Sequence, residues 1–434
     1  MKHSVWKYAV LLLLFSASAP AQMTYLGLKD EANVRKAQKT LTPSFTYWNK
    51  TKIIDDYLYV PTRKGIYRKN LKTTLNDTLW QQYALPNVPV RDFVKNGNNV
   101  LAITHTEGTG NLIVKSTNNG QTFTDATSSF FFNNTSVNGI LQIAQNPKDA
   151  NTVAVLHRGY GIAQSADFGS SWKNLYPFLG GYQDWFVGFN PNDSGNIMYT
   201  GEELFFRSYV QATYDGGTTW QRVDSLQTHC THGITFHPTD KNVMLSYGEG
   251  RIGRSTDQGR TWTDFNFFPI YVFKVVYDPA NPDTVYASGD FPGTSDDILI
   301  YKSVDGGKTW YLSYQQVIKD SDGVLDLQLY KDRLIVYTLV NGVYFIDTAL
   351  LDVKDPQVAA KTTVYPNPAT DVLYIESPYT LNRVSVYDHT GKRVLQQPLN
   401  SKKAAVSLEQ LAAGIYHVVL DTEKGSASKK IIKK

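Results

Sequence analysis

One eight-residue pattern, Ser/Thr-x-Asp-x-Gly-x-x-Trp, constrains this chain more than any other feature because it recurs at a nearly constant spacing. Full copies begin at Ser165, Thr213, Ser255 and Ser303, and a variant that begins at Ser116 has Asn118 and Phe123 at the Asp and Trp positions. Successive copies start 42 to 49 residues apart. This period is typical of propeller blades or solenoid turns, so we expect a repeat protein.

Each copy of the pattern predicts a tight turn followed by a strand. The Asp accepts hydrogen bonds from backbone N–H groups about two residues further on, and the Gly supplies the positive φ that such a turn needs. The Trp then anchors the next strand against a neighbouring sheet. We assign a structural role to these positions: Asn118, Gly120, Phe123, Asp167, Gly169, Trp172, Asp215, Gly217, Trp220, Asp257, Gly259, Trp262, Asp305, Gly307 and Trp310.

The five copies resemble the Asp-box (BNR) repeats of sialidase-like and sortilin-like propellers, and the resemblance covers most of residues 44–350. It implies that each box lies on the outer turn between the third and fourth strands of a blade. It also implies that the ligand site lies elsewhere, where the loops of several blades converge on a central channel.

A second landmark gives the number of blades. An apolar strand, an Asn/His/Asp-Pro dipeptide and a second β-rich run recur between the boxes, and the second runs are residues 58–60, 100–104, 152–156, 197–200, 243–247, 284–287 and 334–338. The predicted fold is all-β, a seven-bladed β-propeller followed by a small C-terminal β-sandwich, with six blades as the alternative count. We expect residues 45–48 to complete the last blade, and Trp80 to replace the box Trp in the first.

The N-terminus has the features of a secretory signal peptide. Lys2 and Lys7 flank a positive start, residues 10–15 are apolar, and Ala19-Pro20-Ala21 suits cleavage before Gln22. Residues 1–21 are therefore expected to be removed, and residues 22–43 to form a polar leader. No later apolar stretch reaches the roughly 18 to 20 residues that a membrane span needs, so we expect no transmembrane segment in the mature chain.

Charge and cysteine content narrow the classes of function. Residues 22–361 contain 31 basic and 33 acidic residues, a net charge of −2, which gives no electrostatic footprint for nucleic acid. The single cysteine, Cys230, excludes an internal disulfide in an exported protein. Stability must therefore come from packing and from closure of the ring.

The repeat period ends near residue 350, and residues 351–361 are a predicted linker. Residues 362–434 contain a Tyr-Pro-Asn-Pro opening, a Tyr-Asp-x-x-Gly-Lys turn, a Leu-x-x-Gly-x-Tyr strand and a Lys-Lys-x-x-Lys-Lys tail. This order resembles the type A C-terminal sorting domain of the type IX secretion system of Bacteroidota. The resemblance implies recognition by that machinery after passage through the periplasm, and then a secreted or surface-attached protein.

Loops that converge on one end of a propeller channel are the expected place for a ligand. The candidate binding residues there are Tyr182, Trp185, His157, Arg158, Arg251, His232 and Tyr271. Aromatic rings interleaved with charged groups suit a glycan, a peptide or a partner protein at the cell surface. We therefore favour a binding or scaffold module.

A secreted glycoside hydrolase is the alternative function. Paired carboxylates could cleave a glycosidic bond at suitable separations, and the candidates are Glu202, Glu203, Glu249 and Asp290. Two comparisons argue against it. The early Arg-Ile-Pro motif of sialidases is absent, and the segment at residues 62–68 that is similar to a catalytic segment of xyloglucan-cleaving propellers has Lys64 in place of the acid.

Histidines at 229, 232 and 237 with Cys230 match no standard metal-ligand spacing. His237 occupies a turn position before a proline, and His232 aligns with Trp185 and Phe273, so we favour packing and turn roles. We expect no cofactor and no metal, with one alternative: a structural calcium ion held by Asp320 and Asp322 or by Asp296 and Asp297.

Overall fold

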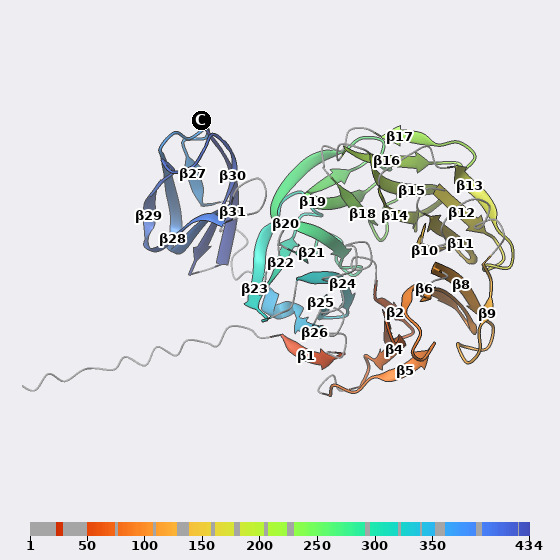
Figure 1. Cartoon of the computed structure of the whole chain (residues 1–434). Helices are drawn as coiled ribbons and strands as arrows, with labels where there is room; N and C mark the ends of the chain where they lie inside the picture. The colour runs from red at the N-terminus through yellow and green to blue at the C-terminus, as the bar shows by residue number, and fades with distance from the viewer. Residues whose placement is uncertain are drawn as a thin grey trace, which may run out of the picture.

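The computed structural model describes residues 23–28, 50–73, 77–106, 110–127, 139–157, 161–177, 183–203, 207–223, 230–290, 296–319, 323–338, 341–351, 361–387, 393–423 and 425–434. Figure 1 shows two β domains, a ring of sheets and a smaller C-terminal domain beside it. The predicted fold class, an all-β propeller followed by a small C-terminal β-sandwich, is confirmed apart from the number of blades.

The first four sheets of the ring are antiparallel meanders of four strands each. They contain β2 (Lys52–Ile54), β3 (Tyr57–Thr62), β4 (Gly65–Asn70) and β5 (Gln81–Ala84); β6 (Val90–Asn96), β7 (Asn99–Thr106), β8 (Gly110–Ser116) and β9 (Thr124–Asp125); β10 (Ile140–Asn146), β11 (Asp149–His157), β12 (Gly161–Ser165) and β13 (Lys173–Pro177); and β14 (Gln183–Asn190), β15 (Asp193–Glu203), β16 (Arg207–Thr213) and β17 (Gln221–Val223). In each meander the predicted second run lies on the second strand.

The next sheet has six strands because β20 belongs to two meanders. It contains β18 (Thr231–Phe236), β19 (Met244–Ser255), β20 (Thr263–Tyr277), β21 (Val285–Asp290), β22 (Asp297–Ser303) and β23 (Tyr311–Val317). Residues 263–267 of β20 pair with β19, and residues 271–277 pair with β21. We interpret this sheet as two blades, which is compatible with seven in total; the blade count stays a prediction.

The ring closes through a segment that we had expected to be part of a leader. The last sheet contains β24 (Val324–Tyr330), β25 (Arg333–Thr338) and β26 (Gly342–Asp347), and β1 (Thr24–Gly27) pairs with β26. Residues 45–48, which we expected in this place, lie outside the described residues. β1 suits the edge because Leu26 is fully buried, Tyr25 packs on Tyr344, and the Trp80 indole donates to the Leu26 carbonyl at 2.7 Å.

The five Asp boxes fold into the same turn, and Thr213 to Trp220 illustrates it. The Thr213 hydroxyl donates to Asp215 and accepts the Gly217 N–H at 2.9 Å. Asp215 accepts both the backbone N–H and the hydroxyl of Thr219, four residues on rather than two as expected. Gly217 has φ +97°, and the glycine of every other box also has a positive φ.

Each box also packs on the preceding blade, since the glycine lies against its core. A Cβ on Gly217 would meet Leu175 Cδ1 at 2.2 Å, and a Cβ on Gly307 would meet Leu245 at 2.8 Å. The box therefore joins two blades as well as shaping a turn.

We expect Gly217→Ala to lower the free energy of unfolding by about 2–4 kcal/mol, because it combines a strained φ with a clash. Gly216→Ala is the matched control: Gly216 has φ +71° and nothing within 4 Å of its added Cβ, so it should cost about 1 kcal/mol. Urea unfolding followed by tryptophan fluorescence reports the ring alone, because residues 362–434 contain no tryptophan. Equal losses for the two variants would contradict the packing role.

The carboxylates of the Asp boxes make the stability of the fold depend on pH in the acid range. Hydrogen bonds from Thr219 and Thr213 lower the pKa of Asp215 to about 2. Burial would raise the pKa of Asp167, but hydrogen bonds from Ser171 and Ser165 lower it to about 2. The unfolded value is about 3.9, so these groups stabilise the fold above pH 4, and the contribution is lost as pH falls towards 2. We expect the melting temperature to drop over that window, less steeply for Asp215→Asn; identical slopes would contradict this account.

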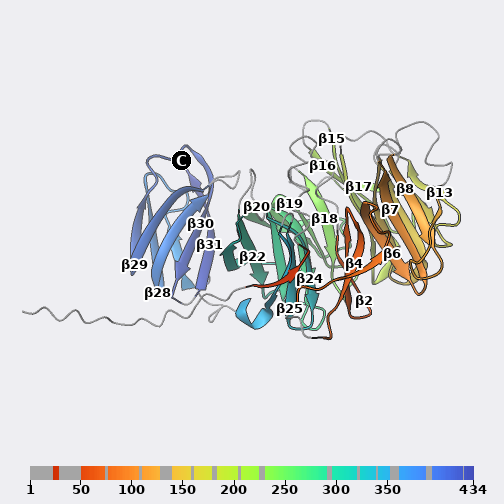
Figure 2. The ribbon, with the colours of Figure 1, turned by 60° about the horizontal axis from the view of Figure 1, so that its bottom comes forward.

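The C-terminal domain is one five-stranded sheet that folds over its own core. It contains β27 (Thr363–Tyr365), β28 (Val372–Tyr387), β29 (Arg393–Ser407), β30 (Gly414–Thr422) and β31 (Gly425–Lys433), after the short 3-10 helix η5 (Thr348–Leu351) and residues 352–360. The first part of β28 pairs with β27 and its second part with β30. β31 lies beside β23 of the ring (Figure 1), and Figure 2 shows β31 on the side of the domain that faces the ring.

The first and last motifs of this domain are in direct contact. The Asn367 side chain of the Tyr-Pro-Asn-Pro opening accepts the Ile432 N–H of the basic tail at 2.9 Å. Lys433 forms an ion pair with Asp371 at 3.2 Å, and the Lys434 N–H donates to the Ala369 carbonyl. The tail is therefore an integral part of the fold of this domain.

Candidate functional site

The boxes and the candidate site residues lie at opposite ends of each blade. Ile197 pairs with Thr213, which begins a box, whereas Glu203 at the other end of β15 pairs with Arg207. We name the end at which the inner strands begin and the second strands finish the site end. The candidates at Trp185, Glu202 and their equivalents in other blades all lie there.

A β-bulge near the start of six inner strands shapes the site end. The register shifts place the bulged residues at equivalent positions: Arg91, Leu141, Trp185, His232, Phe273 and Leu325. Bulges redirect side chains and interrupt pairing, so this position differs from the regular strand that follows it. The alignment of His232 with Trp185 and Phe273 by sequence agrees with this register.

Four rings from adjacent inner strands form an aromatic cluster at the site end: Trp185, His232, Tyr271 and Phe273. The His232 ring centre lies 4.9 Å from Trp185, 5.0 Å from Phe273 and 6.3 Å from Tyr271. His232 is buried, and the other three rings are half-buried. Burial lowers the pKa of His232 to about 4, so the ring is neutral at pH 7 and its Nδ1–H donates to the Val272 carbonyl.

Two of the candidate acids meet at the single cysteine. The Cys230 thiol donates to Glu202 Oε2 at 3.0 Å, and Glu249 also interacts with it. Burial, followed by these carboxylates, raises the pKa of Cys230, so the thiol stays protonated at neutral pH. Glu202 is only 2% exposed, and Glu249 is half-buried.

A glycine directly before Glu249 lets the main chains of β18 and β19 come close enough for Glu249 to interact with Cys230. Gly248 precedes Glu249, and a Cβ there would lie 1.7 Å from the Cys230 carbonyl oxygen, which accepts the Glu249 N–H. Gly289, before Asp290, has the same relation to the Tyr271 carbonyl. In both Gly-acid pairs, the glycine is needed because the main chain of the neighbouring inner strand approaches it too closely for a Cβ.

A third carboxylate, Asp184, is held by tyrosines of its own blade. The hydroxyls of Tyr199 and Tyr209 both donate to Asp184 Oδ1, the latter at 3.0 Å, and lie 2.8 Å from each other. Burial and the Asp184 charge raise the pKa of Tyr199, which keeps its proton as a donor. Asp184 is 1% exposed, so it supports the start of β14 from inside.

The remaining candidates are scattered or lie outside the described residues. His157 is buried at the end of β11, and Arg251 stacks on Phe267 at 4.6 Å. Glu203 and Asp290 end their strands, and their side chains are not described. The structure does not describe Tyr182, Arg158, His229, Asp320 and Asp322.

Metal binding finds no geometric support in the part of the chain that the structure describes. No group of three or more His, Cys, Asp or Glu side chains there is arranged to hold an ion. His237 has the turn role expected, since its Nδ1 accepts the Asp240 N–H at 2.9 Å. Asp297 accepts a hydrogen bond from Gln315 at 3.1 Å, and the calcium alternative stays an untested prediction.

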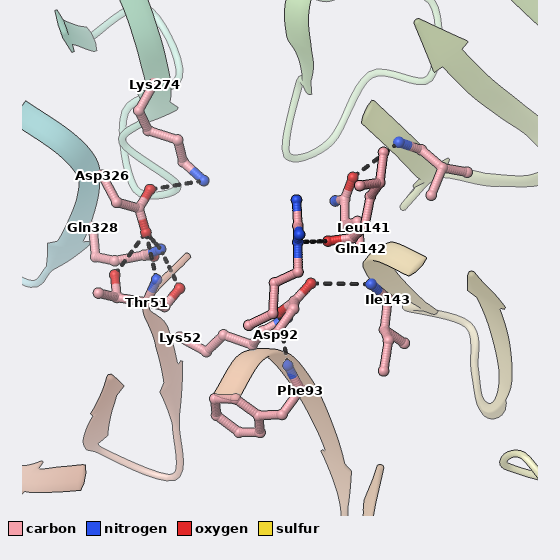
Figure 3. A network of polar contacts seen from close by, with 12 residues as sticks. Thr51, Lys52, Asp92, Phe93, Leu141, Gln142, Ile143, Lys274, Asp326 and Gln328 are labelled. Atoms are coloured by element: carbon pink, nitrogen blue, oxygen red, sulfur yellow. Dashed lines mark hydrogen bonds and ion pairs between the residues drawn. The ribbon is translucent and has the colours of Figure 1, made fainter. Parts of the chain in front are cut away.

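An axial network of polar residues, which the sequence did not reveal, joins the inner strands around the ring axis (Figure 3). Asp92 accepts the Ile143 N–H of the next blade at 3.0 Å and pairs with Lys52 at 2.9 Å. Gln142 accepts the Val187 N–H in the same way. The available signal was a polar residue directly after four of the six bulges, at Asp92, Gln142, Lys274 and Asp326.

The network also spans the closure of the ring. Asp326 on β24 accepts the backbone N–H and the hydroxyl of Thr51, both at 2.7 Å, and lies 3.3 Å from the Lys274 ammonium. Gln328 donates to the Thr51 carbonyl at 2.8 Å. Figure 3 shows Lys274 and Asp326 on one side and Asp92 with Gln142 on the other.

Comparison with known proteins defines the class of each domain. Residues 363–434 match the secretion system C-terminal sorting domain, and residues 208–322 match the family described as sortilin, neurotensin receptor 3. The chain is thus an Asp-box propeller followed by a type IX sorting domain. This domain marks it for export to the cell surface or the medium.

Individual relatives include a sortilin and a probable xyloglucanase. Sortilin from Danio rerio is 30% identical over 192 residues, covering 42% of this chain and 22% of that protein. A probable oligoxyloglucan-reducing end-specific xyloglucanase from Neosartorya fischeri is 24% identical over 164 residues, covering 32% and 19%. The chain therefore spans about a fifth of the curated relatives that it matches.

Solved structures support the fold. The GH74 enzyme of Niastella koreensis aligns with a TM-score of 0.57 at 14% identity, over 89% of this chain and 72% of that one. YCF48 bound to a D1 peptide aligns with a TM-score of 0.50 at 16% identity, over 70% and 94%. Among the described residues, no helix has the length and apolar character that crossing a membrane requires.

Proposed function

We propose that this exported propeller is a binding or scaffold module, and that its ligand, a glycan or a peptide, stacks on the aromatic cluster at the site end. The observation that carries this proposal is the meeting of half-buried Trp185, Tyr271 and Phe273 around His232. Rings held by bulged strands are rigid and lose little entropy when they bind a flat apolar face.

The state of the acids supports binding over hydrolysis. A catalytic carboxylate must reach the substrate, yet Glu202 is 2% exposed and accepts the Cys230 thiol, and Asp184 is 1% exposed and bound by two tyrosines. Lys64, at the hairpin between β3 and β4, is an exposed lysine where similar hydrolases have an acid.

Glycoside hydrolysis stays the second candidate because of one arrangement. Glu202 and Glu249, from adjacent blades, approach the same thiol, so two carboxylates are close together at the site end. Movement of Cys230 would be needed to free them for an acid and base pair.

A glycan and peptide array probed with the full chain tests the proposal. We expect selective binding that falls at least tenfold in the Trp185→Ala/Tyr271→Ala variant, because stacking of this kind is lost with the rings. Tyr67→Ala, which removes a half-buried ring from β4, is the matched control and should bind as the wild type does. Absence of selective binding, or binding that the double variant retains, would refute the proposal.

Product analysis of each glycan that binds separates the two candidates. Under the binding proposal the wild type leaves the glycan intact. Turnover that disappears in Glu202→Gln and Glu249→Gln would establish the hydrolase instead.

A further inference from the structure

Lys50 lies where the inner strands converge. It lies two residues before β2, and its ammonium is 5.5 Å from the ring centre of Phe186 on β14. After burial itself, Lys274 on β20 and Asp326 on β24 have the largest effects on its pKa. Lys50 in turn acts on the pKa of His232 on β18. A group that interacts with so many inner strands lies near the ring axis.

The other lysines of the axial network are already paired. Lys52 contacts Asp92 Oδ1 at 2.9 Å, and Lys274 contacts Asp326 Oδ1 at 3.3 Å. Both carboxylates also hold backbone N–H groups, those of Phe93 and Ile143 for Asp92 and that of Thr51 for Asp326. Each of these two lysines is thus paired with one aspartate.

Lys50 has no such balance. Within the described residues its ammonium makes no hydrogen bond and no ion pair, and the Phe186 ring is its contact. Burial lowers its pKa to about 8, so most of it still carries a charge at pH 7. His232 is neutral there and supplies no countercharge. Asp92 and Asp326 also act on Lys50, so among these described residues three ammonium groups share two carboxylates, and the positive charge in excess favours an anion.

We propose that the ring axis carries an oxyanion site, in which Lys50 binds a carboxylate, sulfate or phosphate group with Lys52 and Lys274 beside it. The ammonium donates three hydrogen bonds to such a group, and the flanking lysines add to the attraction. The site goes beyond the aromatic cluster and stands without it. His232 belongs to the aromatic cluster, and the charge of Lys50 lowers its pKa, so the cluster and Lys50 are near each other. A ligand stacked on the cluster can therefore place an anionic group on the ring axis.

Calorimetric titration of the full chain with sodium sulfate at pH 7 and constant ionic strength tests the site. We expect saturable binding that weakens at least tenfold in Lys50→Met. Lys64→Met, which removes an exposed lysine at the same end of the ring, should leave the affinity unchanged. Absence of saturable binding in the wild type, or equal affinity in Lys50→Met, would overturn the proposal.

Two further readouts accompany the titration, and the first of them uses the wild type alone. Wild-type affinity for sulfate should fall at least tenfold between pH 7 and pH 9.5 as Lys50 loses its proton. Of the groups that interact with Lys50, Lys274 has a raised pKa and His232 has a pKa of about 4; Lys52, Asp92 and Asp326 also act on the pKa of Lys50, and buried Arg91 is a further cation of the inner strands. Without sulfate, Lys50→Met should melt at a higher temperature than the wild type, because an unpaired charge has been removed. A flat pH profile would also contradict the site.

The source of the anion is resolved by paired compounds. Glucuronic acid against glucose tests an acidic sugar, and a short peptide with a free C-terminal carboxylate against its amide tests a peptide end. In either pair, the charged member should bind at least tenfold more tightly, and only when Lys50 is present.

Discussion

Replacing Asp326 by alanine is expected to lower the free energy of unfolding of the propeller by about 3–5 kcal/mol. Its carboxylate is fully buried and holds three groups: the Thr51 N–H, the Thr51 hydroxyl and the Lys274 ammonium. Alanine leaves a buried N–H without its acceptor and a buried ammonium without its counterion. The effect is large because these contacts join the first inner strand to the last across the closure of the ring.

Urea unfolding followed by tryptophan fluorescence measures this loss, with an unchanged m-value as the sign that the unfolded state is the same. Asp326→Asn keeps an acceptor for Thr51 but removes the charge, and it should fall between alanine and the wild type. Asp297→Ala is the control, since the hydrogen bond that this aspartate accepts from Gln315 is exposed to solvent. An alanine variant at 326 as stable as this control would show that the axial network does not hold the ring closed.

Replacing Gly248 by alanine is the second change with a large expected effect, about 3–5 kcal/mol. The added Cβ would meet the Cys230 carbonyl oxygen at 1.7 Å, its carbon at 2.8 Å and Thr231 Cα at 3.0 Å. All three atoms belong to the main chain, so β18 or β19 must move. This movement breaks the hydrogen bond from the Glu249 N–H to the Cys230 carbonyl.

Cys230 reports this movement directly because it is the single cysteine of the chain. In the wild type the thiol is buried and its pKa is raised, so it should react slowly with a disulfide reagent. We expect Gly248→Ala to react at least tenfold faster. Gly97→Ala, with open space around its added Cβ, is the control. If Gly248→Ala proves as stable and as unreactive as this control, the described geometry of the site end is wrong.

The sequence predicted the parts of the fold that repeat. The boxes gave the spacing of the blades, and the runs after the Pro turns marked the second strands. Both signals repeat because the blades share the same turn and the same packing on the preceding blade. Residues 24–27 were missed as the closing strand because a short segment with one copy has no repeat to identify it. The shared strand β20 was invisible for a related reason, since its two halves belong to different blades.

The site was predicted only in part, and the reason is geometric. Trp185, His232 and Tyr271 were named because they precede inner strands, and the structure places them together. Glu202 and Glu249 were named as candidate catalytic acids, but their contact with Cys230 depends on two blades and a bulge. Lys50, Lys274 and Asp326 are far apart in the sequence and follow no motif, so only closure of the ring brings them together.

Hydrogen–deuterium exchange of the full chain, with and without an array-selected ligand, tests the central claim most directly: the ligand binds at the site end, opposite the boxes. Protection is expected in residues 183–186, 231–234 and 270–274, with no change in the box turns at 213–220 and 255–262. Protection confined to the box turns, with the aromatic cluster unaffected, would contradict the claim.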